Sequence, residues 1–407
     1  MRFQKEILTN EKEERYFMKY DFSSVYDRRY TGSMKWGDTE KGKAFDGAIP
    51  FSTADMEFAA APKIRKAVSD FAKKGFFCYT GADEKYKKAV CDFMLRRHDF
   101  KVEPEWIVPT YGIVSALNTA VRSLTNEGDG VIIQRPVYRP FSAAIENNNR
   151  KIVNNALVQS GDSYEMNFEE LEKLCKDESN KMMILCSPHN PISRVWKKEE
   201  LVRVADICLE NGVILVSDEI HFDITRENHT VLLSLGEKYR ENTIVCTATS
   251  KSFNIAGLST SNIIIPSEKL RSAFTNLISR DGYSCINCAA YPATIAAYTE
   301  CDDWLDEMNA VVNENFDFLE RFLKENIPQA SMAKHGGTYL AWINVSFLKM
   351  EENELKRFFF EKVGIVPSFG TWFGEEGKGF IRLNIAVAKS VLENTLNRFK
   401  AAVDALQ

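Results

Sequence analysis

The sequence predicts an α/β fold: a large domain whose mainly parallel sheet is covered by helices, followed by a smaller α+β domain. The chain has 407 residues, of which 44% are hydrophobic, and this suffices for two domains with cores of their own. Short runs that are apolar throughout are separated by charged stretches of helical period. Such runs are typical of strands covered on both faces, and strands separated by helices indicate a parallel sheet.

The strands of the large domain are expected in the middle of the chain. Their apolar runs cover residues 129–133, 181–186, 212–217, 242–248 and 263–265. Residues 197–211 carry the charged, helix-period pattern between two of these runs. Gly212 follows this stretch directly and ends the predicted helix, because glycine readily adopts the left-handed conformation found at helix ends.

A different pattern begins after about residue 290. Residues 291–326 predict a long helix, which Pro292 is expected to break near its start. Strand-like runs and a last helix follow, at residues 338–345, 364–367, 380–387 and 391–406. We therefore expect a large domain over residues 48–288. The smaller α+β domain would combine residues 289–407 with residues 1–47, which pack against it or across the cleft.

Charge and cysteine content narrow the class of protein. The net charge is −5, with acids and bases spread along the chain, so a nucleic-acid partner is not expected. The polar N-terminus lacks the apolar core of a signal peptide, and no stretch reaches the ~20 apolar residues that span a bilayer. The nine cysteines are an odd number and several lie in apolar runs, as expected for reduced thiols. These features predict a cytoplasmic protein without a membrane partner.

Two short motifs and the histidines provide no metal or nucleotide site. Residues 37–43 begin like a phosphate-binding P-loop, but Ala44 stands where magnesium binding needs Ser or Thr, and no predicted strand precedes the loop. Cys285 and Cys288 form a lone CxxC pair without the second cysteine pair or histidine pair that a zinc site requires. The five histidines are scattered. We interpret the loop as solvated and the cysteine pair as structural, and expect no metal.

Polar residues follow three predicted strands of the large domain. Asn190, Asp218 and Lys251 each come shortly after an apolar run, and ligands of open parallel sheets bind beyond the carboxyl ends of the strands. A lysine in this place is costly unless it is paired or used chemically, and a lysine with a depressed pKa can form a Schiff base. Each residue alone has an ordinary alternative: a turn amide, a helix-capping acid or an exposed loop lysine.

Two further elements complete the set. Arg382 lies inside a strand-like apolar run, where an arginine is either ion-paired or directed at a carboxylate. Gly112 leads into an apolar helical stretch at residues 116–124, and a glycine turn into a helix N-terminus suits a phosphate. Pyridoxal phosphate (PLP) requires such a set: a lysine for an imine, an acid for the pyridinium nitrogen, an amide for the phenolate oxygen, a phosphate site and an arginine for the substrate carboxylate.

In this order, the motifs resemble the fold-type I PLP enzymes of the class I/II aminotransferase superfamily, and most closely their MalY/PatB-type cystathionine β-lyase branch. The resemblance extends from about Tyr20 to the end of the chain, and it implies the type I PLP-transferase fold. The segments that carry it are residues 26–29, 31–36, 54–58, 79–80, 137–141, 187–191, 217–221, 250–254, 370–374 and 382–384.

The resemblance implies a role for each candidate residue. Lys251 would hold PLP and move the α-proton of the substrate, and Arg382 would bind the substrate carboxylate. Asp218 would pair with the ring nitrogen, and Asn190 would bind the phenolate oxygen. The other cofactor-binding residues would be His221, Tyr138 on the ring face, Gly112, Ile113 and Ser250 at the phosphate, and Tyr79, which would reach the phosphate of the neighbouring subunit. A homodimer with shared active sites follows from the last of these.

His221 and the departures from the family pattern bear on the substrate. Ordinary aminotransferases place a tyrosine three residues after the aspartate, whereas the β-lyase branch reads DEIH, as this chain does. The resemblance thus implies a carbon–sulfur β-lyase that converts cystathionine or a cysteine S-conjugate to pyruvate, ammonia and a thiol. The alternatives are an aminotransferase and a regulatory protein that kept the fold. Ser52, Tyr111 and residues 192–193 depart from the branch, and the first two are expected near the substrate pocket.

Overall fold

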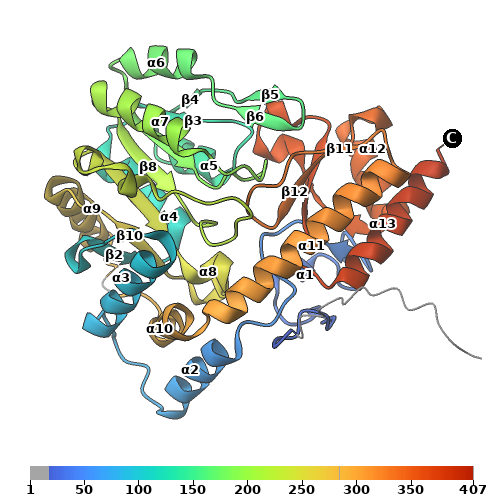
Figure 1. The fold of residues 1–407 in the computed structure, drawn as a ribbon, viewed down its shortest axis with the longest axis horizontal. Helices are drawn as coiled ribbons and strands as arrows, with labels where there is room; N and C mark the ends of the chain where they lie inside the picture. Colours follow the sequence, from blue (N-terminus) through green and yellow to red (C-terminus); the bar gives the residue numbers. More distant parts are fainter. Residues whose placement is uncertain (1–17, 284, 407) are drawn as a thin grey trace, which may run out of the picture.

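A seven-stranded sheet forms the centre of the larger part of the molecule in the computed structural model, which describes residues 18–283 and 285–406 (Figure 1). Its strands lie in the order β2 (Ile107–Thr110), β10 (Ser261–Ile264), β9 (Thr243–Thr247), β8 (Ile214–Asp218), β7 (Asn180–Cys186), β3 (Gly130–Ile133) and β4 (Lys151–Asn154). All neighbouring pairs from β9 to β4 are parallel, whereas β10 runs antiparallel to both of its neighbours. The predicted α/β fold with a mainly parallel sheet is confirmed.

The central strands bury side chains on both faces, which explains their continuous apolar runs. Ile132, Met183 and Leu215 belong to one buried cluster, while Val131 and Met182, their neighbours in the chain, belong to another. Successive side chains of a strand point to opposite faces, so both faces of this sheet must be covered.

Helices provide this cover. One face packs against α4 (Ile113–Leu124), α5 (Pro140–Glu146) and α9 (Glu268–Arg280). The other packs against α3 (Glu84–His98), α6 (Phe168–Lys176), α7 (Lys198–Glu210) and α10 (Ala290–Glu300), and α2 (Pro62–Lys73) packs on α10. The predicted stop of α7 is confirmed, because Gly212 has a φ of 67°. In the described residues, no helix combines the length and apolar character that a membrane crossing needs.

The C-terminal part forms a smaller α+β unit around an antiparallel sheet. Its strands lie in the order β11 (Ser331–Met332), β12 (Leu340–Asn344), β15 (Phe380–Asn384) and β14 (Ser368–Phe369). Its helices are α11 (Asp302–Asn326), α12 (Glu352–Arg357) and α13 (Lys389–Asp404), and α11 runs from the neighbourhood of α10 to α13 (Figure 1). A short hairpin, β5 (Val158–Ser160) and β6 (Ser163–Glu165), lies between β4 and α6 in the chain, and its Tyr164 hydroxyl accepts a hydrogen bond from the Trp342 indole of β12 at 3.0 Å.

The N-terminal segment lies against this smaller unit. The backbone N–H groups of Lys19 and Tyr20 each donate to the Glu307 carboxylate of α11 at 3.0 Å. After the short helix α1 (Met34–Gly37), strand β1 (Ile49–Pro50) pairs in parallel with β13 (Ile365–Val366). These contacts agree with the expected packing of the N-terminal residues, of which 1–17 lie outside the described part. The domain boundaries at 47/48 and 288/289 stay a prediction.

The predicted break at Pro292 is wrong. Pro292 lies in the first turn of α10, and the long helical stretch is divided at Cys301 instead, between α10 and α11. A proline is tolerated in the first turn because the N–H groups there have no helical partner to lose. Asp302 and Asp303 then start α11, where acidic side chains favour a helix N-terminus.

Asn315 supplies a test of how α11 is held in place. Its buried Nδ2 donates to the carbonyls of Ile385 and Val387, both at 2.9 Å, and so ties α11 to the segment after β15. Asn315→Ala leaves two buried acceptors unpaired, and we expect the free energy of unfolding to fall by about 2 kcal/mol in urea denaturation. Asn326→Ala is the control, because its amide donates to the Phe322 carbonyl of its own helix and to no other described residue. Equal losses in both variants would contradict this role.

Candidate active site

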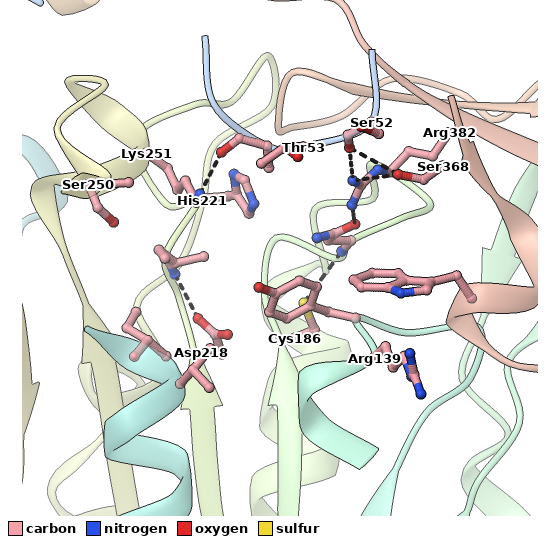
Figure 2. A pocket seen from close by; sticks show the side chains of 18 of the residues that line it. Ser52, Thr53, Arg139, Cys186, Asp218, His221, Ser250, Lys251, Ser368 and Arg382 are labelled. Atoms are coloured by element: carbon pink, nitrogen blue, oxygen red, sulfur yellow. Dashed lines mark hydrogen bonds between the residues drawn. The ribbon is translucent and has the colours of Figure 1, made fainter. Parts of the chain in front are cut away.

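A cavity of about 890 Å³ lies at the carboxyl ends of the central strands (Figure 2). Asn190, Asp218, Lys251 and Arg382 all line it, although they come from four distant parts of the chain. The first three follow or end β7, β8 and β9, which are neighbours in the sheet, and Arg382 comes from β15 of the smaller sheet. The expected convergence of these residues is therefore observed.

Asp218 is a buried carboxyl that lacks a cationic partner. It is the last residue of β8, its side chain is 3% exposed, and Oδ1 accepts a hydrogen bond from the Ile220 N–H at 3.1 Å. Burial raises the pKa of Asp218 to about 7. No cation within the described residues lies at ion-pair distance from it. A protonated ring nitrogen in the cavity would supply the missing positive charge, so the site fits a pyridinium.

Lys251 is held in the cavity by a backbone carbonyl. It lies on α8 (Thr249–Ser252), directly after β9, and its amine donates to the carbonyl oxygen of Ala54. Burial lowers the pKa of Lys251 to about 8, so a sizeable fraction of the amine is neutral and nucleophilic near neutral pH. This position excludes the alternative of an exposed loop lysine.

Arg382 is buried without a carboxylate partner. Its Nη1 donates to Asn190 Oδ1 at 2.9 Å, and its Nη2 donates to Ser368 Oγ at 3.0 Å and to the Ser52 carbonyl (Figure 2). The side chain is 3% exposed, and burial lowers the pKa of the guanidinium to about 10. In residues 18–283 and 285–406 no carboxylate pairs with it. Of the two alternatives for an arginine in an apolar strand, the structural ion pair is therefore not observed, and the charge is available for the carboxylate of a ligand.

The N-terminus of α4 lies at the cavity wall. Gly112 precedes the helix with φ 98° and ψ 163°, a conformation that favours glycine. Gly112 and Ile113 line the cavity together with Ser250. The first N–H groups of a helix point at a ligand bound there, and the helix dipole favours negative charge. The predicted phosphate residues therefore lie together, on the same cavity as Asp218.

Tyr138 and His221 also line the cavity. The Tyr138 ring lies 5.9 Å from that of Trp372, and the tyrosine N–H donates to the Asn190 carbonyl at 3.1 Å. His221 is buried, its ring lies edge-on to Tyr339 at 5.7 Å, and burial lowers its pKa to about 3, so the imidazole is neutral. Both predicted positions thus belong to the site.

Tyr79 is the one predicted residue that does not lie with the others. Its side chain is 94% exposed and does not line the cavity. The role expected of it involves the phosphate of a neighbouring subunit, so a single chain leaves this expectation untested. It stays a prediction.

The residues that depart from the family pattern divide into two groups. Ser52 and Tyr111 line the cavity, as expected. The Tyr111 hydroxyl donates to the carbonyl of Cys285. Ile192 and Ser193 are buried away from the cavity, and Ser193 has a φ of 57°, in the region that favours glycine. Its hydroxyl bonds to the Leu340 carbonyl, a contact that glycine could not make.

Sequence reasoning missed several residues of the cavity. Among them are Arg139, Ser259, Thr260, Glu352, Lys356 and Ser368. Most lie on loops or on the short helix α12, and their polar character is ordinary for a surface, so the sequence offered no signal. Trp372 also lines the cavity, and its GTWFG segment was noted only as a motif.

No metal centre accompanies this site within the described residues, where no three His, Cys, Asp or Glu side chains gather as metal ligands. Cys285 and Cys288 are both free thiols.

Comparison with known proteins places the chain in a family. The family model described as aminotransferase class I and II matches residues 46–399. The chain belongs to this family. Cystathionine beta-lyase PatB of Bacillus subtilis is 38% identical over 94% of this chain and 100% of its own length, and Protein MalY of Escherichia coli is 32% identical over 92% and 96%.

A solved structure agrees with this family in both fold and sequence. Cystalysin from Treponema denticola, whose crystal structure contains pyridoxal 5'-phosphate, is 40% identical with a TM-score of 0.92, and the match covers 96% of this chain and all of that one. The two chains therefore share the same overall fold.

The burial of Asp218 can be tested without cofactor. Its folded-state pKa of about 7 lies above its usual value of 3.8, so ionisation opposes folding. The penalty is absent well below pH 4, grows as the pH rises to about 7 and is constant above. In thermal unfolding, cofactor-free Asp218→Asn should therefore gain more stability over the wild type at pH 8 than at pH 4.

Asp317→Asn is the matched control, because Asp317 is an exposed carboxylate paired with Arg226. It should gain no stability at pH 8. A gain for Asp218→Asn that does not change with pH would contradict the buried, unpaired carboxyl.

Proposed function

We propose that this protein is a PLP-dependent carbon–sulfur β-lyase. It would act on cystathionine or a related cysteine S-conjugate, and it would produce pyruvate, ammonia and a thiol. The observation that carries the proposal is that one cavity holds both a buried Asp218, which lacks a cationic partner, and the half-buried amine of Lys251. The name of the Bacillus subtilis relative, a cystathionine beta-lyase, supports the same chemistry.

PLP, when bound, withdraws electrons from the substrate's Cα and stabilises the charge left there after the proton departs. Asp218 would bind its ring nitrogen, and Lys251 would bind it covalently through the side-chain amine. The other holding residues would be Asn190 at the phenolate oxygen, Tyr138 on the ring face, His221 beside the ring, and Gly112, Ile113 and Ser250 at the phosphate.

The protein's own groups account for substrate binding and proton movement. Arg382 binds the substrate carboxylate with its buried guanidinium, which orients Cα toward the centre of the cavity. The amine of Lys251, set free when the amine of the substrate takes its place, takes the α-proton. The electron pair of the broken C–H bond forms a double bond to Cβ as the thiolate leaves with the electrons of the C–S bond. Water then releases pyruvate and ammonia.

We also infer that the protein is a cytoplasmic homodimer. Phe76, Phe77 and Tyr79 are 73%, 66% and 94% exposed, and three neighbouring aromatic side chains seldom remain open to water. A second copy that covers them would bring Tyr79 to the phosphate site of the other subunit. The nine cysteines are all free, which supports a reducing compartment.

The decisive experiment measures pyruvate and free thiol released from L-cystathionine by the PLP-loaded protein without a keto acid. We expect steady release of both over many turnovers. The Lys251→Ala protein should lack both this release and the visible absorbance of the lysine-linked cofactor. The Asp218→Asn protein should bind PLP but lose most turnover, because its ring partner is no longer charged.

Two outcomes would contradict the proposal. Amino transfer to an added keto acid, without pyruvate release, would assign the protein to the aminotransferases of the family and direct attention to Ser52 and Tyr111. Unchanged turnover in Lys251→Ala would remove the proposed base.

A further inference from the structure

A row of backbone carbonyls connects the two halves of the active site. Residues 52–56, here called the carbonyl row, cross between the large sheet and the smaller unit, and each of their carbonyl oxygens accepts a hydrogen bond from a side chain. Among the donors are Arg382 to Ser52, Asn384 to Thr53, Lys251 to Ala54, Lys35 to Asp55 and Arg28 to Met56. Four of these carbonyls have a further side-chain donor: Ser368 to Ser52, Tyr339 to Ala54, Asn384 to Asp55 and Asn254 to Met56. The groups proposed to bind the substrate and move its proton are therefore both held by this row.

The carbonyl row is anchored at its end by Glu57. The Glu57 N–H donates to the Ala386 carbonyl at 2.9 Å. Its carboxylate receives the Lys35 amine at 2.7 Å and the Trp36 indole N–H at 3.1 and 3.2 Å. Arg28 lies 3.6 Å away and also bonds to Asp55, at 3.0 and 3.3 Å. The N-terminal segment thus supplies every cation that surrounds this anchor among the described residues.

Lys35 joins the anchor to the row. Its side chain is fully buried, and the same amine that pairs with Glu57 donates to the Asp55 carbonyl at 2.8 Å. Asp55 is the next residue after Ala54, whose carbonyl holds Lys251. A buried ammonium group that loses its hydrogen-bonding or ion-pair partners is costly in free energy. The Lys35 amine therefore holds Glu57 and the Asp55 carbonyl in fixed positions relative to each other.

We propose that Lys35 and Glu57 are positioning residues of the active site: together they set the course of the carbonyl row and thereby the places of the Lys251 amine and the Arg382 guanidinium. Neither residue lines the cavity, so neither is catalytic. The kinetic part of this inference rests on the proposed function, whereas the contacts do not.

The pair also explains two motifs that the cofactor chemistry leaves without a role. Lys35 and Trp36 end the segment 31–36, and Glu57 lies in the segment 54–58, where the resembling branch has an aspartate. The two segments are about twenty residues apart in the sequence, and the ion pair between Lys35 and Glu57 joins them. Glu57→Asp keeps the charge and shortens the side chain by one methylene, which makes it the conservative variant.

The experiment compares Lys35→Met, Glu57→Gln, Glu57→Asp and Trp36→Phe in the PLP-loaded enzyme. Leu396→Ala is the control, because it lowers stability by removing a buried side chain from α13, a helix that packs on α11 and on residues 358–363. Below the unfolding temperature of each variant, Lys35→Met and Glu57→Gln should lose between about 10- and 100-fold in kcat/KM, the cost of a small misplacement of reacting groups. Leu396→Ala should retain wild-type values, and Glu57→Asp should lose less than Glu57→Gln.

A second readout needs no turnover. Acetic anhydride is applied in trace amount to the cofactor-free full chain, and peptide mass spectrometry gives the labelling of Lys251 relative to the exposed lysines. We expect Lys35→Met to change this ratio severalfold, and Leu396→Ala to leave it unchanged. If the wild type proves to have no lyase activity, this measurement still tests the pair, so the two proposals fail separately.

If Lys35→Met does not fold, Trp36→Phe and Glu57→Gln are measured in its place. Trp36→Phe is the milder change, because it removes a single hydrogen-bond donor to Glu57. Variants that lose thermal stability but retain wild-type kcat, KM and Lys251 labelling would show that the pair only stabilises the N-terminal segment, and the proposal would be overturned.

Discussion

The exclusion of water from the ionisable groups of one cavity is the constraint on which the site depends. Burial raises the pKa of Asp218 and lowers those of Lys251 and Arg382. The chain offsets the cost with neutral partners, such as backbone carbonyls, an amide and a hydroxyl, instead of counter-ions. Each charge therefore remains available for a ligand, which explains why an acid, an amine and a guanidinium can face the same space.

The fold places these groups by joining two sheets. Strands β7, β8 and β9 lie side by side and bring Asn190, Asp218 and Lys251 to one edge, whereas β15 brings Arg382 from the smaller sheet. The Arg382–Asn190 hydrogen bond links the two units directly. The segment 52–57 links them a second time, so the distance between the groups depends on the N-terminal segment as well as on the sheets.

The sequence predicted the features that depend on local apolar patterns or on reactive and charged side chains in unusual places. Apolar runs identified the central strands, and Asn190, Asp218, Lys251 and Arg382 stood out because such groups are rare in or beside buried strands. The antiparallel direction of β10 and the short strands β2 and β4 were not predicted, because pairing partners distant in the chain decide them. The part played by Ala54 was equally hidden, since a carbonyl carries no residue signature. Pro292 misled because its effect depends on its place within the helix.

The measurement that tests the central claim most directly is the identity of the residue that holds the cofactor. The PLP-loaded protein is reduced with borohydride, digested and analysed by peptide mass spectrometry. The account predicts a pyridoxyl phosphate mass on the peptide that contains Lys251, in stoichiometric amount, and on no other lysine. A label on another lysine, or only trace labelling of Lys251, would contradict the assignment of this cavity as the PLP site.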